Sequence, residues 1–230
     1  DAPMGSSSML AAKPEPTIGA TFDQLHERVR VGFTLSVPSG NGAAWDRGDG
    51  AGEVTRYYAV DAKVFFMSLT PAASVRLADW ISIGAGIDVV RSYMSFHGDK
   101  DMGSALNQAA HSPLTDSPFP YADPSMAAPV ELSLGGWGIG AIGGVLLQPH
   151  PSLKIGLSAR THTSTDASGS LDVEYPERMR TLVEDVAPGA ELPALSGNTH
   201  AALGMPLMAS AGVSNQRVPA WDINADYRYT

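Results

Sequence analysis

The sequence predicts an all-β fold of one particular kind, a transmembrane up-and-down antiparallel β-barrel. Three observations predict it: segments that alternate apolar and mildly polar residues, connections that are alternately long and short, and a low content of charged residues, 17%. Alternation with a period of two is typical of β-strands, because successive side chains leave opposite faces of the sheet. Long loops at one end and short turns at the other are typical of barrels in outer membranes.

The segment 79–90, DWISIGAGIDVV, shows the alternation most clearly. One face holds Ile81, Ile83, Ala85, Ile87 and Val89, and the other holds Ser82, Gly84, Gly86 and Asp88. A soluble sheet would turn a charged face to water, whereas this second face is mostly glycine and serine. We therefore expect the aliphatic face to contact lipid and the other face to line the barrel interior, where Asp88 would be hydrated.

Six more segments alternate in the same way, at 29–37, 57–77, 131–148, 155–173, 207–213 and 221–229. With 81–96 they predict about seven strands. Their connections run long, then short, with about 18, 2–3, 34, 4, 27 and 4 residues, as in outer-membrane barrels. We expect extracellular loops at about 38–56, 98–130 and 175–201, the last with a short helix in PERMRTLVEDV. Residues 28–230 form the barrel portion, and 1–27 remain unassigned.

The overall composition excludes several classes of protein. No run is long and apolar enough for a membrane-spanning helix, and the mean hydropathy of −0.05 suits a barrel, in which only alternate residues face lipid. A net charge of −9 without a Lys/Arg cluster excludes a nucleic-acid partner. A soluble β-sandwich or lipocalin-like barrel is the alternative fold, but it has to explain both the loop rhythm and the charge-poor strands.

No residue pattern in the chain indicates catalysis or metal binding. The chain has no cysteine, its six histidines lack the spacing of a helical zinc site, and no G-x-S-x-G elbow occurs. We therefore expect no catalytic residues, no cofactor and no metal. A lipid hydrolase with a Ser/His pair on the outer face of the barrel is an alternative that the sequence leaves open.

Three segments, in order and with matching spacing, carry a resemblance to a known family. They are SLTPAASVRLADWISIGAGIDVV, GGWGIGAIGGVLLQPHPSLKIGLSART and LGMPLMASAGVSNQRVPAWDINADYRYT. Each resembles a strand–turn–strand pattern of the FadL family of outer-membrane transporters for long-chain fatty acids and other hydrophobic compounds. The sequence departs from the family pattern at Thr70, where asparagine precedes the proline, and at Ala159, where tyrosine precedes the arginine.

The resemblance also implies that the barrel is incomplete. Family members are much longer, close into a full barrel and begin with a plug domain, and nothing in this chain resembles the plug. Seven strands with two open edges cannot sit in a bilayer, because the edge N–H and C=O groups would face lipid without partners. We therefore expect a portion of a larger barrel, or a chain that pairs with a second copy or a missing half.

The function that the resemblance implies is transport across the outer membrane of a Gram-negative cell, without covalent chemistry. The extracellular loops would capture a long-chain fatty acid or other hydrophobic compound and pass it into the lumen. The residues expected to contact the apolar part of the ligand lie in the loop 98–130 and are Met102, Leu106, Leu114, Phe119, Tyr121 and Met126. Arg91 and Arg160 are expected to bind a carboxylate head group. Lys63 is a further candidate for the head group.

Two alternatives stand beside this assignment. The apolar loop residues could instead pack the loop onto the barrel rim. If the loop 98–130 does capture ligand, apolar residues of the loop 175–201 could line the same capture site; they are Leu182, Val183, Val186, Leu192 and Leu195. As a whole, the protein could also be a structural or adhesive outer-membrane barrel whose loops bind surface partners.

Overall fold

The structure is a computed structural model and describes residues 9–12, 15–45, 57, 59–109, 123–186, 188–189, 191–218 and 221–229. The strands in these ranges are β1 (Met9–Ala12), β2 (Thr17–His26), β3 (Val29–Trp45), β4 (Ala59–Ala78), β5 (Ile81–Asp101), β6 (Ala127–His150), β7 (Leu153–Arg160), β8 (Thr163–Val173), β9 (Gly197–Met205), β10 (Met208–Val218) and β11 (Trp221–Tyr229). The helices are α1 (Met102–Ala109), the 3-10 turn η2 (Pro124–Met126) and α2 (Glu177–Val186).

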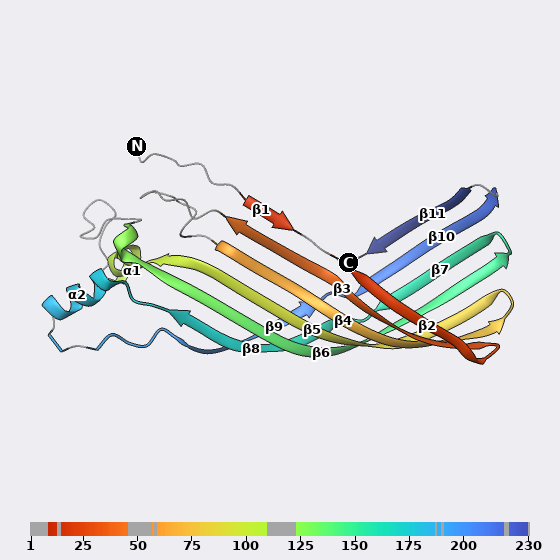
Figure 1. The fold of residues 1–230 in the computed structure, drawn as a ribbon, viewed down its shortest axis with the longest axis horizontal. Helices are drawn as coiled ribbons and strands as arrows, with labels where there is room; N and C mark the ends of the chain where they lie inside the picture. Colours follow the sequence, from red (N-terminus) through yellow and green to blue (C-terminus); the bar gives the residue numbers. More distant parts are fainter. Residues whose placement is uncertain are drawn as a thin grey trace.

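All eleven of these strands belong to one antiparallel sheet that follows the order of the chain. β1 and β2 share one position beside β3, β7 and β8 share one beside β6, and β9 and β10 share the next. Among the described residues no pairing joins β11 to β1 or β2, so the sheet is a curved wall with two open edges (Figure 1). The predicted up-and-down barrel is confirmed, in the form of a partial barrel.

The two ends of the wall differ as the loop rhythm predicts. Two-residue turns at 27–28, 79–80 and 151–152 join neighbouring strands at one end. The helices α1 and α2 lie together at the opposite end (Figure 1). Neither of them, nor any other helix in the part of the chain that the structure describes, has the length and apolar character of a membrane span.

The outer face of the wall is apolar and exposed. Along β5, Ile83 and Ile87 are exposed while Asp88 and Val90, on the opposite face, are buried. The exposed large apolar side chains of the other strands include Ile18, Phe22, Phe33, Leu35, Met67, Leu69, Trp137, Ile139, Leu157, Val213 and Tyr227. An apolar outer face is what a membrane-spanning wall presents to hydrocarbon.

The longest strands extend well past the thickness of a bilayer. β5 has 21 residues and β6 has 24, and the two are paired along nearly their whole length. A tilted strand needs only about 9–11 residues to cross the hydrocarbon. The loops expected at 38–56, 98–130 and 175–201 are therefore shorter. β3 continues to Trp45 and β5 to Asp101, while β6 begins at Ala127 and β9 at Gly197.

Two strands, β1 and β2, lie in the N-terminal segment that the sequence leaves unassigned. Thr17–His26 forms β2 and pairs antiparallel with β3, with Ile18 opposite Leu35 and Phe22 opposite Val31. Its alternation contains only Ile18, Ala20 and Phe22 between polar residues. A run this short is a weak strand signal by itself, and the partner strand β3 supplies the hydrogen bonds that fix it.

In two neighbouring strand positions, β7–β8 and β9–β10, the alternation of inward and outward side chains reverses at the same height of the wall. Between β7 and β8, Thr161 and His162 interrupt the ladder, and residues 161–165 lie opposite only 138–141 of β6. The extra residue reverses the faces, so even-numbered side chains such as Arg160 face inward in β7, and odd-numbered ones such as Thr165 face inward in β8. β9 and β10 are interrupted opposite this point, at 206–207, which keeps the two positions in register.

An arginine on the outer face should block assembly of the barrel. We expect Ile87→Arg to cost about 2–4 kcal/mol, the penalty for a cation near the bilayer midplane, whereas Ser82→Arg on the inner face of β5 should assemble. Heat-modifiable migration of the protein in isolated outer membranes measures both. Equal yields of the two folded variants would contradict the assignment of the faces.

Candidate ligand-binding site

Segments of the β5–β6 connection and of the β8–β9 connection pack into one apolar cluster at the helical end, which we call the loop cluster. Its buried members are Met102 of α1, Met126 of η2, Ala128 of β6 and Met179 of α2. Partly buried side chains around them are Leu106, Val173, Tyr175, Leu182, Leu192 and Leu195. Three methionines from three separate segments make this core adaptable, because the unbranched thioether fits irregular shapes.

A polar contact holds α2 against the turn η2. Asp123 Oδ1 accepts hydrogen bonds from the hydroxyl and the backbone N–H of Ser125, at 2.7 and 2.9 Å, and Arg178 Nη1 lies 2.6 Å from Oδ2. The hydrogen bonds from Ser125, and then the positive charge of Arg178, lower the pKa of the Asp123 carboxyl. The carboxylate is therefore charged at neutral pH and ties the two long connections together.

An apolar column on the inner face leads from the loop cluster down the wall. Alternate residues of β6 from Ala128 to Leu134 face inward, and Ala128 and Leu134 themselves are buried. Below them Phe66 of β4, Val90 of β5 and Met205 of β9 form a second buried cluster. Strands β4, β5, β6 and β9 thus contribute apolar side chains to the inner face of the wall.

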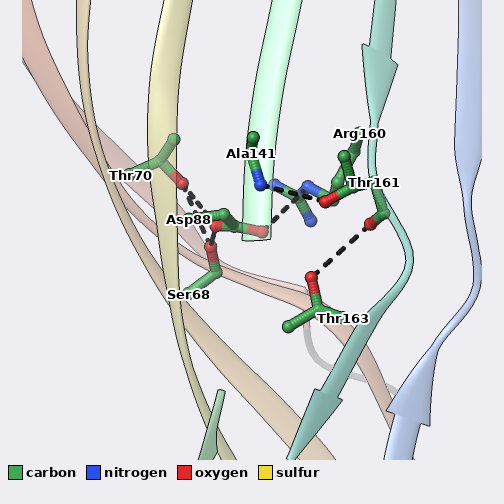
Figure 2. Close-up of polar contacts among 7 residues, drawn as sticks. All are labelled: Ser68, Thr70, Asp88, Ala141, Arg160, Thr161 and Thr163. Atoms are coloured by element: carbon green, nitrogen blue, oxygen red, sulfur yellow. Dashed lines mark hydrogen bonds and ion pairs between the residues drawn. The ribbon is translucent and has the colours of Figure 1, made fainter. Parts of the chain in front are cut away.

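A buried polar layer interrupts this column. Asp88 of β5 has no exposed side-chain surface, and its Oδ2 lies 3.1 Å from Nε of Arg160 at the end of β7 (Figure 2). Its Oδ1 accepts hydrogen bonds from the hydroxyls of Thr70, at 2.8 Å, and Ser68. Asp88 pairs with Gly140 of β6 and Arg160 with Ile142, so the ion pair spans β6 from one side to the other.

Glycines on β6 provide the space for the polar layer. Gly138 and Gly140 occupy inward positions, and a Cβ at Gly138 would collide with the backbone oxygen of Ser164. β8 therefore approaches β6 more closely than any side chain would allow. Across this bare strip Thr165 of β8 reaches Ser92 of β5, with 2.6 Å between their hydroxyl oxygens.

The loop residues expected to contact ligand meet in the structure as far as it describes them. Met102, Leu106 and Met126 lie together in the loop cluster, with Leu182 of the other long connection beside them. Leu114, Phe119 and Tyr121 lie outside the described residues, as does the side chain of Val186. The sequence prediction missed Met179, because a lone methionine in a polar helix has no distinctive signal.

The three cations considered for a head group lie on different faces. Arg160 lies on the inner face, paired with Asp88. Lys63 lies on the outer face of β4, with Nζ 2.7 Å from Asp61 Oδ2. Arg91 also lies on the outer face, where its guanidinium carbon is 5.2 Å from the ring centre of Trp137. Arg160 is therefore the candidate that the structure places beside the lumen.

The polar layer is the feature that sequence analysis described only in part. The alternation places Asp88 on the interior face but assigns it to hydration, whereas it is fully buried and ion-paired. The available signal was that Asp88 is the only charged residue on a face of glycine and serine. Within the described ranges no three His, Asp or Glu side chains come close enough together to hold a metal ion.

Several solved structures share this fold. The chain superposes on a crystal structure of a Pseudomonas aeruginosa FadL homologue with a TM-score of 0.75 and 21% identity, covering 93% of this chain and 48% of that one. For the Pseudomonas putida toluene transporter TodX the values are 0.64, 15%, 96% and 58%. For the CymD monoaromatic hydrocarbon channel they are 0.58, 17%, 96% and 57%.

These identities establish the fold, and the chain spans about half the length of the structures it matches. A comparison with curated proteins finds no match. The model of one family, described as outer membrane protein transport protein (OMPP1/FadL/TodX), matches residues 15–230. The match covers nearly the whole chain, including all three segments that carry the resemblance in sequence. The chain therefore belongs to the OMPP1/FadL/TodX family of outer-membrane transport proteins.

Proposed function

We propose that this chain is part of an outer-membrane barrel, in a Gram-negative cell, that transports long-chain fatty acids or other hydrophobic compounds. The observation that carries the proposal is that a second apolar cluster lies on the inner face below the loop cluster, with inward side chains of β6 between the two. An apolar ligand captured between α1 and α2 would move from one apolar surface to the next without crossing water.

The class of ligand is also supported by the names of similar proteins. TodX is called a toluene transporter and CymD a monoaromatic hydrocarbon channel. Both names describe compounds that partition into apolar surfaces and carry little or no charge. The side chains of Phe66, Val90 and Met205 suit such compounds, because they offer dispersion contacts.

The polar layer would set where an amphipathic ligand stops. Arg160 directs Nε at Asp88, and its side chain is 14% exposed. Its two amino groups would then be available to the carboxylate of a fatty acid whose alkyl chain lies along the column. Transport of this kind involves binding and release alone, so we propose no covalent step and no cofactor.

A purely structural or adhesive barrel is a weaker explanation of the same features. Loops that bind polar surface partners have no need of three buried methionines from separate segments. A hydrophobic core at the mouth of an apolar column is better explained by capture of a hydrophobic ligand.

The test uses the complete protein purified from outer membranes in its folded form. We expect bound fatty acid or hydrocarbon, identified by mass spectrometry, to fall about tenfold in Leu106→Gln and in Met126→Gln, since each removes apolar contact. Glu184→Gln, an exposed change on α2, should retain the ligand. A folded wild-type protein that is reproducibly empty and takes up no added oleate would contradict the proposal.

A further inference from the structure

Arg91, on the outer face of the wall, is a cation that the proposed transport function does not use. Arg91 belongs to β5 and is the first charged residue above the apolar series that ends at Val89 on that face. The residues in register with Val89, Leu69 on β4 and Ile139 on β6, are also apolar. Arg91 therefore lies at the upper boundary of the hydrocarbon, on the side of the extracellular loops.

The position of this guanidinium is fixed by its neighbours on β6. It lies over the indole of Trp137, with 5.2 Å between the guanidinium carbon and the ring centre. It also fills a notch at Gly135, where an added Cβ would come within 2.7 Å of Arg91 Nη2. A side chain held by a ring on one side and a bare glycine on the other loses little freedom when it binds a ligand.

Arg91 has no anionic partner among the residues that the structure describes, since none of their carboxylates lies within salt-bridge distance of it. Two other polar groups on this face have partners: Lys63 Nζ lies 2.7 Å from Asp61 Oδ2, and His97 Nδ1 lies 3.2 Å from Glu131 Oε1. Asp166 pairs with Trp137 from β8, across β6 from Arg91, and so leaves the β5 side open to an anion.

Aromatic residues continue the surface above Arg91. Phe65 of β4 and Tyr93 of β5 are cross-strand partners, with ring centres 5.1 Å apart. Together with Trp137 they form an aromatic belt at the height where lipid head groups meet hydrocarbon. Arginine beside exposed aromatic rings combines a bidentate donor for phosphate with a surface for the adjoining acyl chains.

We propose that Arg91, Trp137 and Gly135 form a binding site for the phosphate of an outer-leaflet lipid. The guanidinium donates two hydrogen bonds to the phosphate oxygens, and the indole packs against the upper part of the acyl chains. The site rests on the proposed function only in its location, since it requires the wall to stand in an outer membrane. It is separate from the inner surface along which the transported compound would move.

The experiment measures lipid retained by the complete protein. The protein is reconstituted in nanodiscs of phosphatidylcholine that contain phosphorylated lipid A, then released and analysed by native mass spectrometry. We expect retention of lipid A to fall about tenfold in Arg91→Gln, and by less in Trp137→Leu. Lys63→Gln, which removes a cation from the same face, should retain lipid A as the wild type does.

Two comparisons keep the result decisive. Lipid A from which the phosphates have been removed should be retained poorly by the wild-type protein, and excess inorganic phosphate should not displace the intact lipid. Equal retention of both lipids, or unchanged retention in folded Arg91→Gln, would overturn the proposed site. Binding of oleate is measured on the same samples, so a failure of the transport proposal appears in that signal alone.

Discussion

Replacing Asp88 with leucine should lower the free energy of unfolding by about 3–5 kcal/mol, the cost of leaving one member of a buried ion pair without its partner. Asp88 is completely buried, and its loss strands the Arg160 guanidinium among apolar and hydroxyl groups. Denaturant unfolding of the protein in lipid vesicles, followed by tryptophan fluorescence, measures the change. Asp172→Leu, at an exposed position on β8, is the matched control and should change stability by much less.

The double variant separates the charge from the rest of the layer. Asp88→Leu combined with Arg160→Met should recover most of the loss, because an apolar pair can replace a buried ion pair at little cost. Ser68 and Thr70 would retain each other, since their hydroxyl oxygens are already 3.1 Å apart. A double variant as unstable as Asp88→Leu alone would show that the two charges are not energetically coupled.

A single methyl group at Gly138 should be at least as damaging. Its Cβ would overlap the backbone oxygen of Ser164 and come within 2.8 Å of Thr165, and a backbone carbonyl in a paired strand cannot move aside. We expect Gly138→Ala to exceed the about 1–3 kcal/mol typical of overpacking and to separate β6 from β8. The yield of folded barrel and its unfolding midpoint measure the effect.

Gly156 offers the matched control for this change. It lies on β7, next to β6 in the same wall, and an added Cβ there would meet nothing within 4 Å. Gly156→Ala should therefore assemble normally. If the two alanine variants were equally stable, the close approach of β8 to β6 could not be what requires glycine at Gly138.

The sequence predicts the outer face of this wall well and its inner face poorly. Lipid imposes one simple rule on the outer face, apolar at every second position, and Ile83 and Ile87 obey it. The inner face follows contacts between strands that are distant in the chain. Asp88 can pair with Arg160 because glycines leave the inner face of β6 without side chains between them. No local pattern in either segment predicts this contact.

The phase change between β7 and β8 escaped the sequence analysis for a related reason. Alternation extended through 155–173 predicts one continuous strand, which would turn Val173 to the outside. In the structure the interruption at 161–162 reverses the faces, and Val173 packs against the loop cluster. In the sequence, Thr161 and His162 are as compatible with a continuous strand as with an interruption. Only the pairing with β6 shows that residues 161–165 contain one residue more than the facing segment 138–141.

The paired interruptions also have a mechanical consequence. β6 runs unbroken along the wall, as does β5 on one side of it, while the β7–β8 position on its other side and the β9–β10 position beyond are interrupted at the same height. We therefore expect a displacement at the loop cluster to bend β5 and β6 and to be absorbed at the interruptions of the other two strand positions. Arg160 is the last residue before one of these interruptions. A displacement of α2 that turned β8 and β9 would thus act directly beside the buried ion pair.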